Sequence, residues 1–390
     1  MMTIKSRREL LAAVMPRYAK AQGREKERVL DEFVASTGYH RKYAIHLLHH
    51  PPGERRRQKR RKPRRYNAKV EFALFDVWKV ANCIAAKRLV PCLGEFVEAL
   101  ERHGELRLDP DTRALLLSMS ISTADRLLRP HRTGARGRGL ATTKPGSLLK
   151  KSIPVRTFAD WDDARPGFVE VDLVAHCGQS ADGQYLNTLD MTDIGTGWTE
   201  CLALLNKSQR QVSKAVAAAR QRFPFPLLGI DSDNGSEFIN ANLVRYCAQE
   251  KITFTRSREY HKNDQAHVEQ KNWSVVRQFV GYDRYEGTTA LRKLEALYQV
   301  LRLYVNFFQP VQKLVAKERV GAKVRKRYDI ARTPYQRALE SEHVSAESKR
   351  WLRQQYASLN PAALLRQIQA LQEDLWRSRE RSSSAARPQG

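Results

Sequence analysis

Three acidic residues in the middle of the chain have the type and spacing that metal-assisted chemistry needs. Asp172 lies in the strand-like run GFVEVDLVAHC (167–177), and Asp233 ends the run PLLGIDSD just before an Asn-Gly turn. Glu269 lies in the helical stretch KNDQAHVEQKNW. Strand ends and the first turns of a following helix can converge at one edge of a sheet, where crowded like charges are costly unless a cation neutralises them. Because Mg²⁺ takes oxygen ligands, the three acids predict a site for two Mg²⁺ ions.

Two further acids compete for a place in this set. Asp231 is a rival of Asp233, because the two-residue period of a strand places both side chains on one face. Glu170 shares a strand face with Asp172 but lies two residues further back from the strand end. From the strand pattern alone, the choice between Asp231 and Asp233 stays open.

The segment around the acids has the pattern of a mixed sheet with helices packed on it. Three consecutive strand-like runs are followed by helix, strand, helix, strand and helix, which is typical of an α/β domain. The strand-like runs are 167–177, 184–193, 197–205, 226–233 and 252–257, and the helical runs are 208–222, 240–249 and 265–279.

The sequence motifs around the acids resemble those of the catalytic core of DDE transposases and retroviral-type integrases. The stretches SDNGSEF and AHVEQKN match that family, including Asn272 three residues after the Glu, and 35 residues separate Asp233 from Glu269. The resemblance covers about residues 165–285 and implies an RNase H-like fold. It implies that Asp172, Asp233 and Glu269 are the catalytic and metal-binding acids, favours Asp233 over Asp231, and makes Asp190 a non-catalytic neighbour.

The activity that the resemblance implies is cleavage and joining of DNA strands by a bacterial insertion-sequence transposase. Two Mg²⁺ ions, with Mn²⁺ as a substitute, would assist phosphoryl transfer on the ends and target of the element. Two ends joined to one target require a homo-oligomer, at least a dimer on DNA. The alternatives are an RNase H-like nuclease that does not join strands and an inactive or regulatory DNA-binding protein.

The charge of the chain indicates a polyanionic partner. It has 69 Lys and Arg against 42 Asp and Glu, a net charge of +27 and a pI near 10.1. Residues 1–167 carry +18 and residues 291–390 carry +11, whereas residues 168–290 carry −2. This segregation predicts basic arms on double-stranded DNA around a near-neutral core. The residues expected to contact DNA are Arg41, Lys42, Arg55, Arg56, Arg57, Lys59, Arg60, Arg61, Lys62, Lys262, Lys271 and Asn272.

The N-terminal region has two stretches that resemble helix-turn-helix units. In the first, a helix breaks at Ser36-Thr37-Gly38 and a basic helix follows from Tyr39 to about Leu48, although an ordinary helical hairpin fits nearly as well. The second stretch ends in DPDTRALLLSMSISTADRLLRP. The cluster His46, His49 and His50 lacks paired cysteines, so a zinc site is disfavoured against a histidine-rich helix end.

The expected organisation is an RNase H-like α/β core between helical, basic flanks. Leu364, Leu365, Ile368, Leu371 and Leu375 form a helical stripe that suits either a core or a coiled coil. Five unpaired cysteines and the lack of a long apolar run predict a soluble protein of the cytoplasm, associated with the nucleoid. The predicted segments are 1–50 (helix-turn-helix-like), 51–66 (basic linker), 67–131 (second helical DNA-binding unit), 132–166 (linker), 167–285 (catalytic core), 286–378 (basic helical region) and 379–390 (disordered tail).

Overall fold

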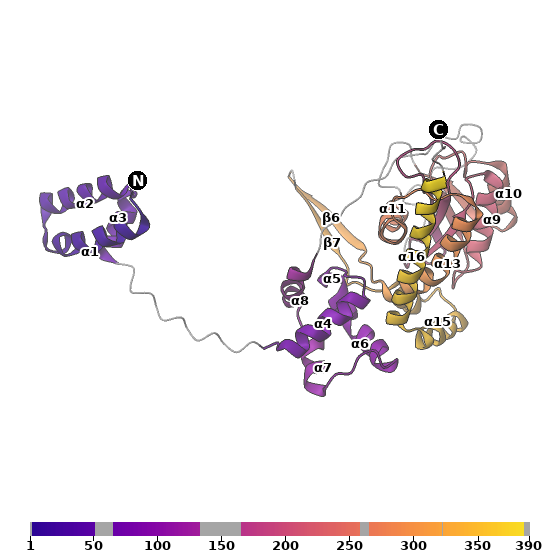
Figure 1. Ribbon diagram of the computed structural model, residues 1–390, viewed down its shortest axis with the longest axis horizontal. Helices are drawn as coiled ribbons and strands as arrows, with labels where there is room; N and C mark the ends of the chain where they lie inside the picture. Colours follow the sequence, from indigo (N-terminus) through magenta and orange to yellow (C-terminus); the bar gives the residue numbers. More distant parts are fainter. Residues whose placement is uncertain (1, 51–64, 133–164, 258–264, 322, 386–390) are drawn as a thin grey trace. The chain divides into compact units, whose positions relative to one another are not determined.

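The computed structural model describes residues 2–50, 65–132, 165–257, 265–321 and 323–385. The chain forms two compact units, Met1–Arg65 and Tyr66–Gly390 (Figure 1). Each unit has its own hydrophobic core, so each is described by itself. Most of the predicted basic linker lies outside the described residues.

The first unit consists of the helices α1 (Ile4–Lys20), α2 (Gly23–Thr37) and α3 (Arg41–His49). Gly38 ends α2 with a φ of 70°, a conformation that favours glycine, and its N–H donates to the Val34 carbonyl (2.8 Å). The turn between α2 and α3 therefore lies where the sequence predicts it. Apolar residues of all three helices form the core: Leu11, Tyr18, Val29, Leu30, Phe33, Ala44, Leu47 and Leu48.

The second unit contains a five-stranded mixed sheet, as the strand pattern predicts. Its strands are β1 (Phe168–Ala175), β2 (Asn187–Asp193), β3 (Thr199–Leu204), β4 (Gly229–Ser232) and β5 (Thr253–Arg256). Their order in the sheet is β3-β2-β1-β4-β5. The first three strands form an antiparallel meander, whereas β4 pairs parallel to β1 and β5 pairs parallel to β4.

The predicted helices of this region are also present. They are α9 (Gln209–Arg220), α10 (Ala241–Gln249), α11 (Ala266–Lys271), the π-helical segment η3 (Asn272–Arg277), α12 (Gln278–Val280) and α13 (Gly287–Phe308). Asn240 starts α10 by accepting the Leu243 N–H on its side-chain oxygen (2.9 Å). In place of the predicted helix 265–279, α11, η3 and α12 follow one another without a break, and the middle segment is π-helical.

The helices that precede the sheet belong to the same compact unit as the sheet. They are α4 (Ala68–Val80), α5 (Ala86–Leu89), η1 (Val90–Cys92), α6 (Leu93–Arg102), α7 (Pro110–Leu117), α8 (Ile121–Leu128) and η2 (Arg129–His131). The Tyr304 hydroxyl of α13 donates to the Val80 carbonyl (2.6 Å), and the Phe96 and Phe308 rings lie 6.2 Å apart. The region predicted as a separate unit, 67–131, thus shares one hydrophobic core with the sheet.

The C-terminal region is helical except for one hairpin that the sequence analysis did not predict. Its elements are β6 (Leu314–Val320), β7 (Lys323–Tyr328), α14 (Pro334–Glu340), α15 (Ala346–Ser358) and α16 (Pro361–Ala385). Helix α16 packs along α13 (Figure 1), where Leu364, Ile368 and Leu375 are buried. The leucine stripe therefore belongs to the core. Within the described residues, no helix combines the length and the apolar character that a membrane span needs.

Helix α13 is joined to the edge of the sheet by two buried polar contacts. The Arg302 guanidinium donates two hydrogen bonds to the carboxylate of Glu200 on β3, each 2.7 Å long. Glu200 also accepts from the Trp198 indole N–H (2.8 Å). The side chain of Asn306 bonds both the N–H and the carbonyl of Thr199, each at 2.9 Å. These contacts satisfy polar groups that burial would otherwise destabilise.

We predict that Glu200→Ala lowers the free energy of unfolding by about 3–5 kcal/mol, because it leaves the Arg302 guanidinium in a largely buried place without its anion. The measurement is urea unfolding of the full chain. Glu373→Ala is the control, since its partner Arg377 lies 3.9 Å away and both side chains are exposed. That exposed pair contributes under about 0.5 kcal/mol. Equal losses in both variants would contradict the account.

Candidate active site

The parallel register of β1 and β4 pairs the acidic side chains of the two strands. Glu170 pairs with Asp231, and the last registered pair is Val171 with Ser232. Asp172 and Asp233 follow that last pair on the same strand faces. The register therefore forms an inner pair of acids, Glu170 and Asp231, and an outer pair, Asp172 and Asp233.

The inner pair is buried and accepts hydrogen bonds from neighbouring elements of the fold. One oxygen of Glu170 accepts the backbone N–H groups of His267 and Val268, both at 2.9 Å, at the start of α11. A carboxylate at a helix N-terminus satisfies amide groups that have no partner in the helix. Asp231 accepts from the hydroxyl of Thr255 on β5 (2.7 Å). Glu170 thus fixes the helix that carries Glu269.

The outer pair is half-buried and poorly neutralised. Burial, then the charge of Asp233 and that of Glu269, raise the pKa of Asp172 to about 7. Its oxygens accept from the Leu173 N–H (2.7 Å) and from the Asn272 amide (2.6 Å), which lower that pKa. Burial and the charge of Glu237 raise the pKa of Asp233 to about 6. Two neighbouring carboxylates that resist ionisation are suited to a cation.

The Asn-Gly turn after β4 fixes the carboxylate of Asp233. The Gly235 N–H donates to Asp233 Oδ1 (2.9 Å), and a Cβ on Gly235 would lie 2.8 Å from that same oxygen. A side chain at this position would therefore displace the carboxylate of Asp233 or Glu237. The Asn234 amide donates to the Ser257 carbonyl (3.1 Å) and its oxygen accepts from Arg256 (3.1 Å), which joins the turn to the end of β5.

Glu269 lies on α11 with an exposed side chain. Its charge reaches Asp172, since it raises the pKa of that carboxyl. The N–H of Glu269 donates to the Gln265 carbonyl (3.1 Å), and the buried Gln265 amide lies 3.5 Å from the Val171 carbonyl and 3.4 Å from that of Asp231. The start of α11 is therefore held against both acid-bearing strands.

The structure corrects the expected role of Lys271. Its side chain is only 3% exposed, so it does not face DNA as expected. Burial lowers its pKa to about 8, and the charge of Asp190, which is fully buried, raises it. Asp190 is the cross-strand partner of Asp172. Lys271 thus supplies a positive charge beneath the acids. Arg277, which also follows Glu269, donates to the Ala175 carbonyl (3.0 Å) instead of facing solvent.

The other residues expected to bind DNA have mixed outcomes. Asn272 donates to Asp172 and is half-buried. In the first unit, Arg41 forms an ion pair with Asp31, and Lys42 is exposed. Eight further residues expected to contact DNA lie outside the described residues: Arg55, Arg56, Arg57, Lys59, Arg60, Arg61, Lys62 and Lys262.

Three residues near the acids were missed by the sequence analysis. Lys207, in the loop before α9, lies 3.7 Å from the buried Glu237 and lowers the pKa of Asp233. Glu237 itself belongs to the quoted stretch SDNGSEF, so its neighbourhood was visible in the sequence. Trp273, 54% exposed, begins the π-helical segment with Asn272. Such segments occur often at functional sites, and the place of Trp273 four residues after Glu269 was a usable signal.

The carboxylate oxygens at this edge are the type of ligand that a hard divalent cation such as Mg²⁺ prefers. Asp172 and Asp233 offer carboxylate oxygens at one edge of the sheet, and their pKa values are raised first by burial and then by neighbouring carboxylates. Among the residues that the structure describes, no three His, Cys, Asp or Glu side chains lie close enough together to hold one metal ion. Asp172 and Asp233 are the residues that would hold a cation, with Glu269 as the third acid of the predicted set.

Fold and site together define an α/β protein with a carboxylate pair at the edge of a mixed sheet. The chain belongs to the same family as the uncharacterized protein y4rM of Sinorhizobium fredii (strain NBRC 101917 / NGR234). The two are 46% identical over 323 residues, which is 83% of this chain and 92% of that protein. No family model matches the chain.

Two solved structures overlap the chain with low scores. The catalytic core domain of BIV integrase is 20% identical and covers 45% of this chain and 96% of its own, with a TM-score of 0.31. The HTLV-2 integrase catalytic core domain in complex with magnesium (dimeric form) is 14% identical and covers 38% and 91%, with a TM-score of 0.29.

We predict that Asp172→Asn stabilises the metal-free protein at pH 8. The folded-state pKa of Asp172, about 7, exceeds its unfolded value. Stability held by the protonated carboxyl is therefore present below about pH 4 and lost as the pH rises to about 7. The amide stays neutral, so the variant should gain about 1–3 kcal/mol at pH 8 and nothing near pH 4. Urea unfolding in chelator measures this gain.

The control for this measurement is Asp111→Asn, which changes an exposed acid at the start of α7. This variant should not gain stability at pH 8, because a negative charge in the first turn of a helix is favourable. A gain for Asp172→Asn that is equal at pH 4 and pH 8 would show that the carboxyl is not strained by ionisation.

Proposed function

We propose that this protein is a DNA transposase that cleaves and joins DNA strands with the help of divalent cations, preferably Mg²⁺. The observation that supports this most is the outer pair, Asp172 and Asp233, whose ionisation is resisted by burial and by neighbouring carboxylates. The mixed sheet and the 35 residues between Asp233 and Glu269 agree with a DDE-type core.

The protein's own groups in this proposal hold and orient the acids. Asp172 and Asp233 would bind the metal, while Gly235 and Asn234 fix the direction of Asp233, and Asn272 holds Asp172. Bound there, divalent cations would supply the positive charge that assists in-line displacement at phosphorus. Glu170 holds the start of α11, the helix that carries Glu269.

The reaction we propose has two displacements in one site. In the first, water attacks a phosphodiester at the end of the element and releases a 3′-hydroxyl. In the second, that hydroxyl attacks a phosphodiester of the target and releases a new 3′-hydroxyl. No covalent intermediate with the protein forms, so no Ser or Tyr nucleophile is needed. Because two ends join one target, we propose at least a dimer on DNA.

The basic flanks would bind the DNA. We propose that the first unit recognises the ends of the element through α3, where Lys42 is exposed and Arg41 lies beside Asp31. The basic residues 55–62 would follow the phosphate backbone, since dense positive charge binds DNA by releasing counterions.

We predict Mg²⁺-dependent cleavage and joining on a labelled duplex that carries the inverted repeats flanking this gene. Glu269→Gln should lower the rate by at least about 100-fold, because it removes a metal-binding charge. Asp231→Asn should retain activity, because an amide oxygen can still accept from the Thr255 hydroxyl. Gel analysis of cleaved and joined strands gives the result.

Three outcomes would change the proposal. Cleavage without joining would indicate a nuclease of the same fold. Sequence-specific binding without cleavage in any variant would indicate a regulatory protein. Loss of activity in Asp231→Asn with retention in Asp233→Asn would assign the metal to the inner pair.

A further inference from the structure

The hairpin β6–β7 is a basic two-stranded ribbon. Every described side chain of its two strands is exposed except that of Ala316, which is half-buried. The hairpin extends away from the sheet and helices of its own unit (Figure 1). Isolated two-stranded ribbons are marginally stable in water, so this one needs support at its base or a partner along its length. Its described cations are Lys317, Arg319, Arg325, Lys326 and Arg327, against the single acid Glu318.

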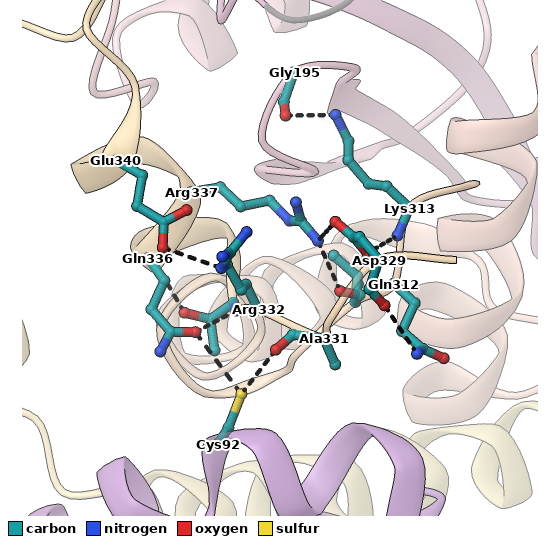
Figure 2. Close-up of polar contacts among 12 residues, drawn as sticks. Cys92, Gly195, Gln312, Lys313, Asp329, Ala331, Arg332, Gln336, Arg337 and Glu340 are labelled. Atoms are coloured by element: carbon teal, nitrogen blue, oxygen red, sulfur yellow. Dashed lines mark hydrogen bonds and ion pairs between the residues drawn. The ribbon is translucent and has the colours of Figure 1, made fainter. Parts of the chain in front are cut away.

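The base of the ribbon is rigidly held, as Figure 2 shows. Asp329 accepts the backbone N–H of Lys313 (2.7 Å) and pairs with Arg337 of α14 (2.8 Å), whose side chain is only 9% exposed. The Lys313 ammonium donates to the Gly195 carbonyl in the turn between β2 and β3 (2.6 Å). The ribbon is therefore an arm fixed directly to the sheet that carries the acids.

A second set of contacts holds the return strand. The backbones of Val311 and Arg332 exchange two hydrogen bonds, 2.9 and 3.1 Å long. The thiol of Cys92, at the start of α6, lies 3.5 Å from the Ala331 carbonyl (Figure 2). Both strands thus enter the body of the unit through paired backbone groups, so the direction of the arm is set by the fold.

The strand register gives the ribbon two different faces. Lys317 pairs with Lys326, and Arg319 pairs with Val324. Because residues two apart share a face, these four side chains lie on one face, which we call the lysine face. Among the described residues no acidic side chain forms an ion pair with its three cations. The other face has Arg325 paired with Glu318 and Arg327 paired with Ala316, so its positive charge is partly offset.

The lysine face continues into the body of the unit. Tyr328 lies on this face, two residues after Lys326, and the exposed Lys87 of α5 lies over its ring at 5.7 Å. A strip of cations with one aromatic side chain therefore runs from α5 along the ribbon toward its tip. Such strips with interleaved aromatics are typical of nucleic-acid surfaces.

We propose that the ribbon β6–β7 lies in the major groove of duplex DNA with its lysine face toward the DNA. Strands of six and seven residues span about 20 Å, and a two-stranded ribbon fits a groove about 12 Å wide. Cations at its edges would meet phosphates on both sides. This inference deepens the proposed function and rests on it for DNA as the partner, but it assigns a separate contact surface.

Other occupants suit the ribbon less well. Pairing of the ribbon with a second copy would place like charges opposite one another. Membrane insertion would need an apolar tip, whereas the exposed Val324 near the turn pairs with Arg319 across the ribbon and precedes Arg325. Double-stranded RNA has a deep, narrow major groove that does not admit a ribbon. These partners become outcomes of the test.

The experiment compares two double variants, each of which removes two positive charges from the ribbon β6–β7. Lys317→Gln/Lys326→Gln changes the lysine face, and Arg325→Gln/Arg327→Gln changes the opposite face. Binding of the full chain to a duplex of about 30 base pairs is measured by fluorescence anisotropy between 50 and 300 mM KCl, a range over which phosphate contacts dominate the salt dependence. The first variant should lower the slope of log K against log[KCl] by about 1.8, and the second by less than half of that.

The controls separate this surface from general charge and from the catalytic proposal. Arg350→Gln/Arg353→Gln on α15 removes two exposed cations elsewhere and should leave the slope unchanged. Unchanged urea midpoints show that the variants are folded. Three results would each overturn the inference. The first is an equal salt slope for all three double variants, and the second is binding of double-stranded RNA as tight as that of DNA. The third is binding to anionic vesicles that depends on the lysine face alone.

Failure of this inference and failure of the proposed function give different results. If the ribbon variants bind alike while the wild type still joins strands, only the ribbon assignment is wrong. If the lysine face controls DNA binding but the wild type neither cleaves nor joins strands, the ribbon assignment stands and the catalytic proposal is wrong.

Discussion

The parallel register between β1 and β4 is the constraint on which the candidate site depends. It brings four carboxylates together in two adjacent pairs, which is unfavourable unless each pair is compensated. In the inner pair, Glu170 accepts two backbone N–H groups and Asp231 accepts a hydroxyl, so both carboxylates are joined to neighbouring elements. In the outer pair, burial first and neighbouring carboxylates second raise the pKa values of Asp172 and Asp233. One register therefore produces both an anchor for the start of α11 and a sheet edge with two carboxylates whose ionisation is resisted.

The surroundings of the sheet keep this register in place. Helix α13 satisfies the buried Glu200 with Arg302 and supplies Asn306 to the backbone of Thr199 at β3. Helix α11 is fixed at its start by Glu170 and covers the sheet with the buried Lys271. The acids thus sit on rigid elements, which is the requirement for holding reacting groups in a fixed geometry.

Much of the sheet could be predicted from the sequence, because period-two apolar patterns report directly on strands. All five strands and the helices α9 and α10 lie within a few residues of the predicted runs. Asp172 and Asp233 were singled out as candidate acids from their strand positions, the Asn-Gly turn and the family resemblance. The structure adds that Glu170, the pairing partner of Asp231, accepts a backbone N–H at the start of α11.

Other features were beyond sequence patterns because they depend on contacts between distant residues. Lys271 looks like a surface cation, and its burial follows from α11 lying on β2 near Asp190. The ribbon β6–β7 was missed because its charged residues hide the alternation that marks a strand. The packing of residues 67–131 into the core of the sheet was also missed, since their helical pattern fits a separate unit equally well. The leucine stripe of α16 had two interpretations, and only packing against α13 decides between them.

The most direct test of the account is the position of a bound metal. Crystals of the full chain soaked in Mn²⁺ would be measured at a wavelength where manganese scatters anomalously. The account predicts an anomalous peak between the carboxylates of Asp172 and Asp233, absent in Asp233→Asn. A peak at Glu170 and Asp231, or no peak at the edge of the sheet in the wild type, would contradict the assignment of the outer pair as the metal site.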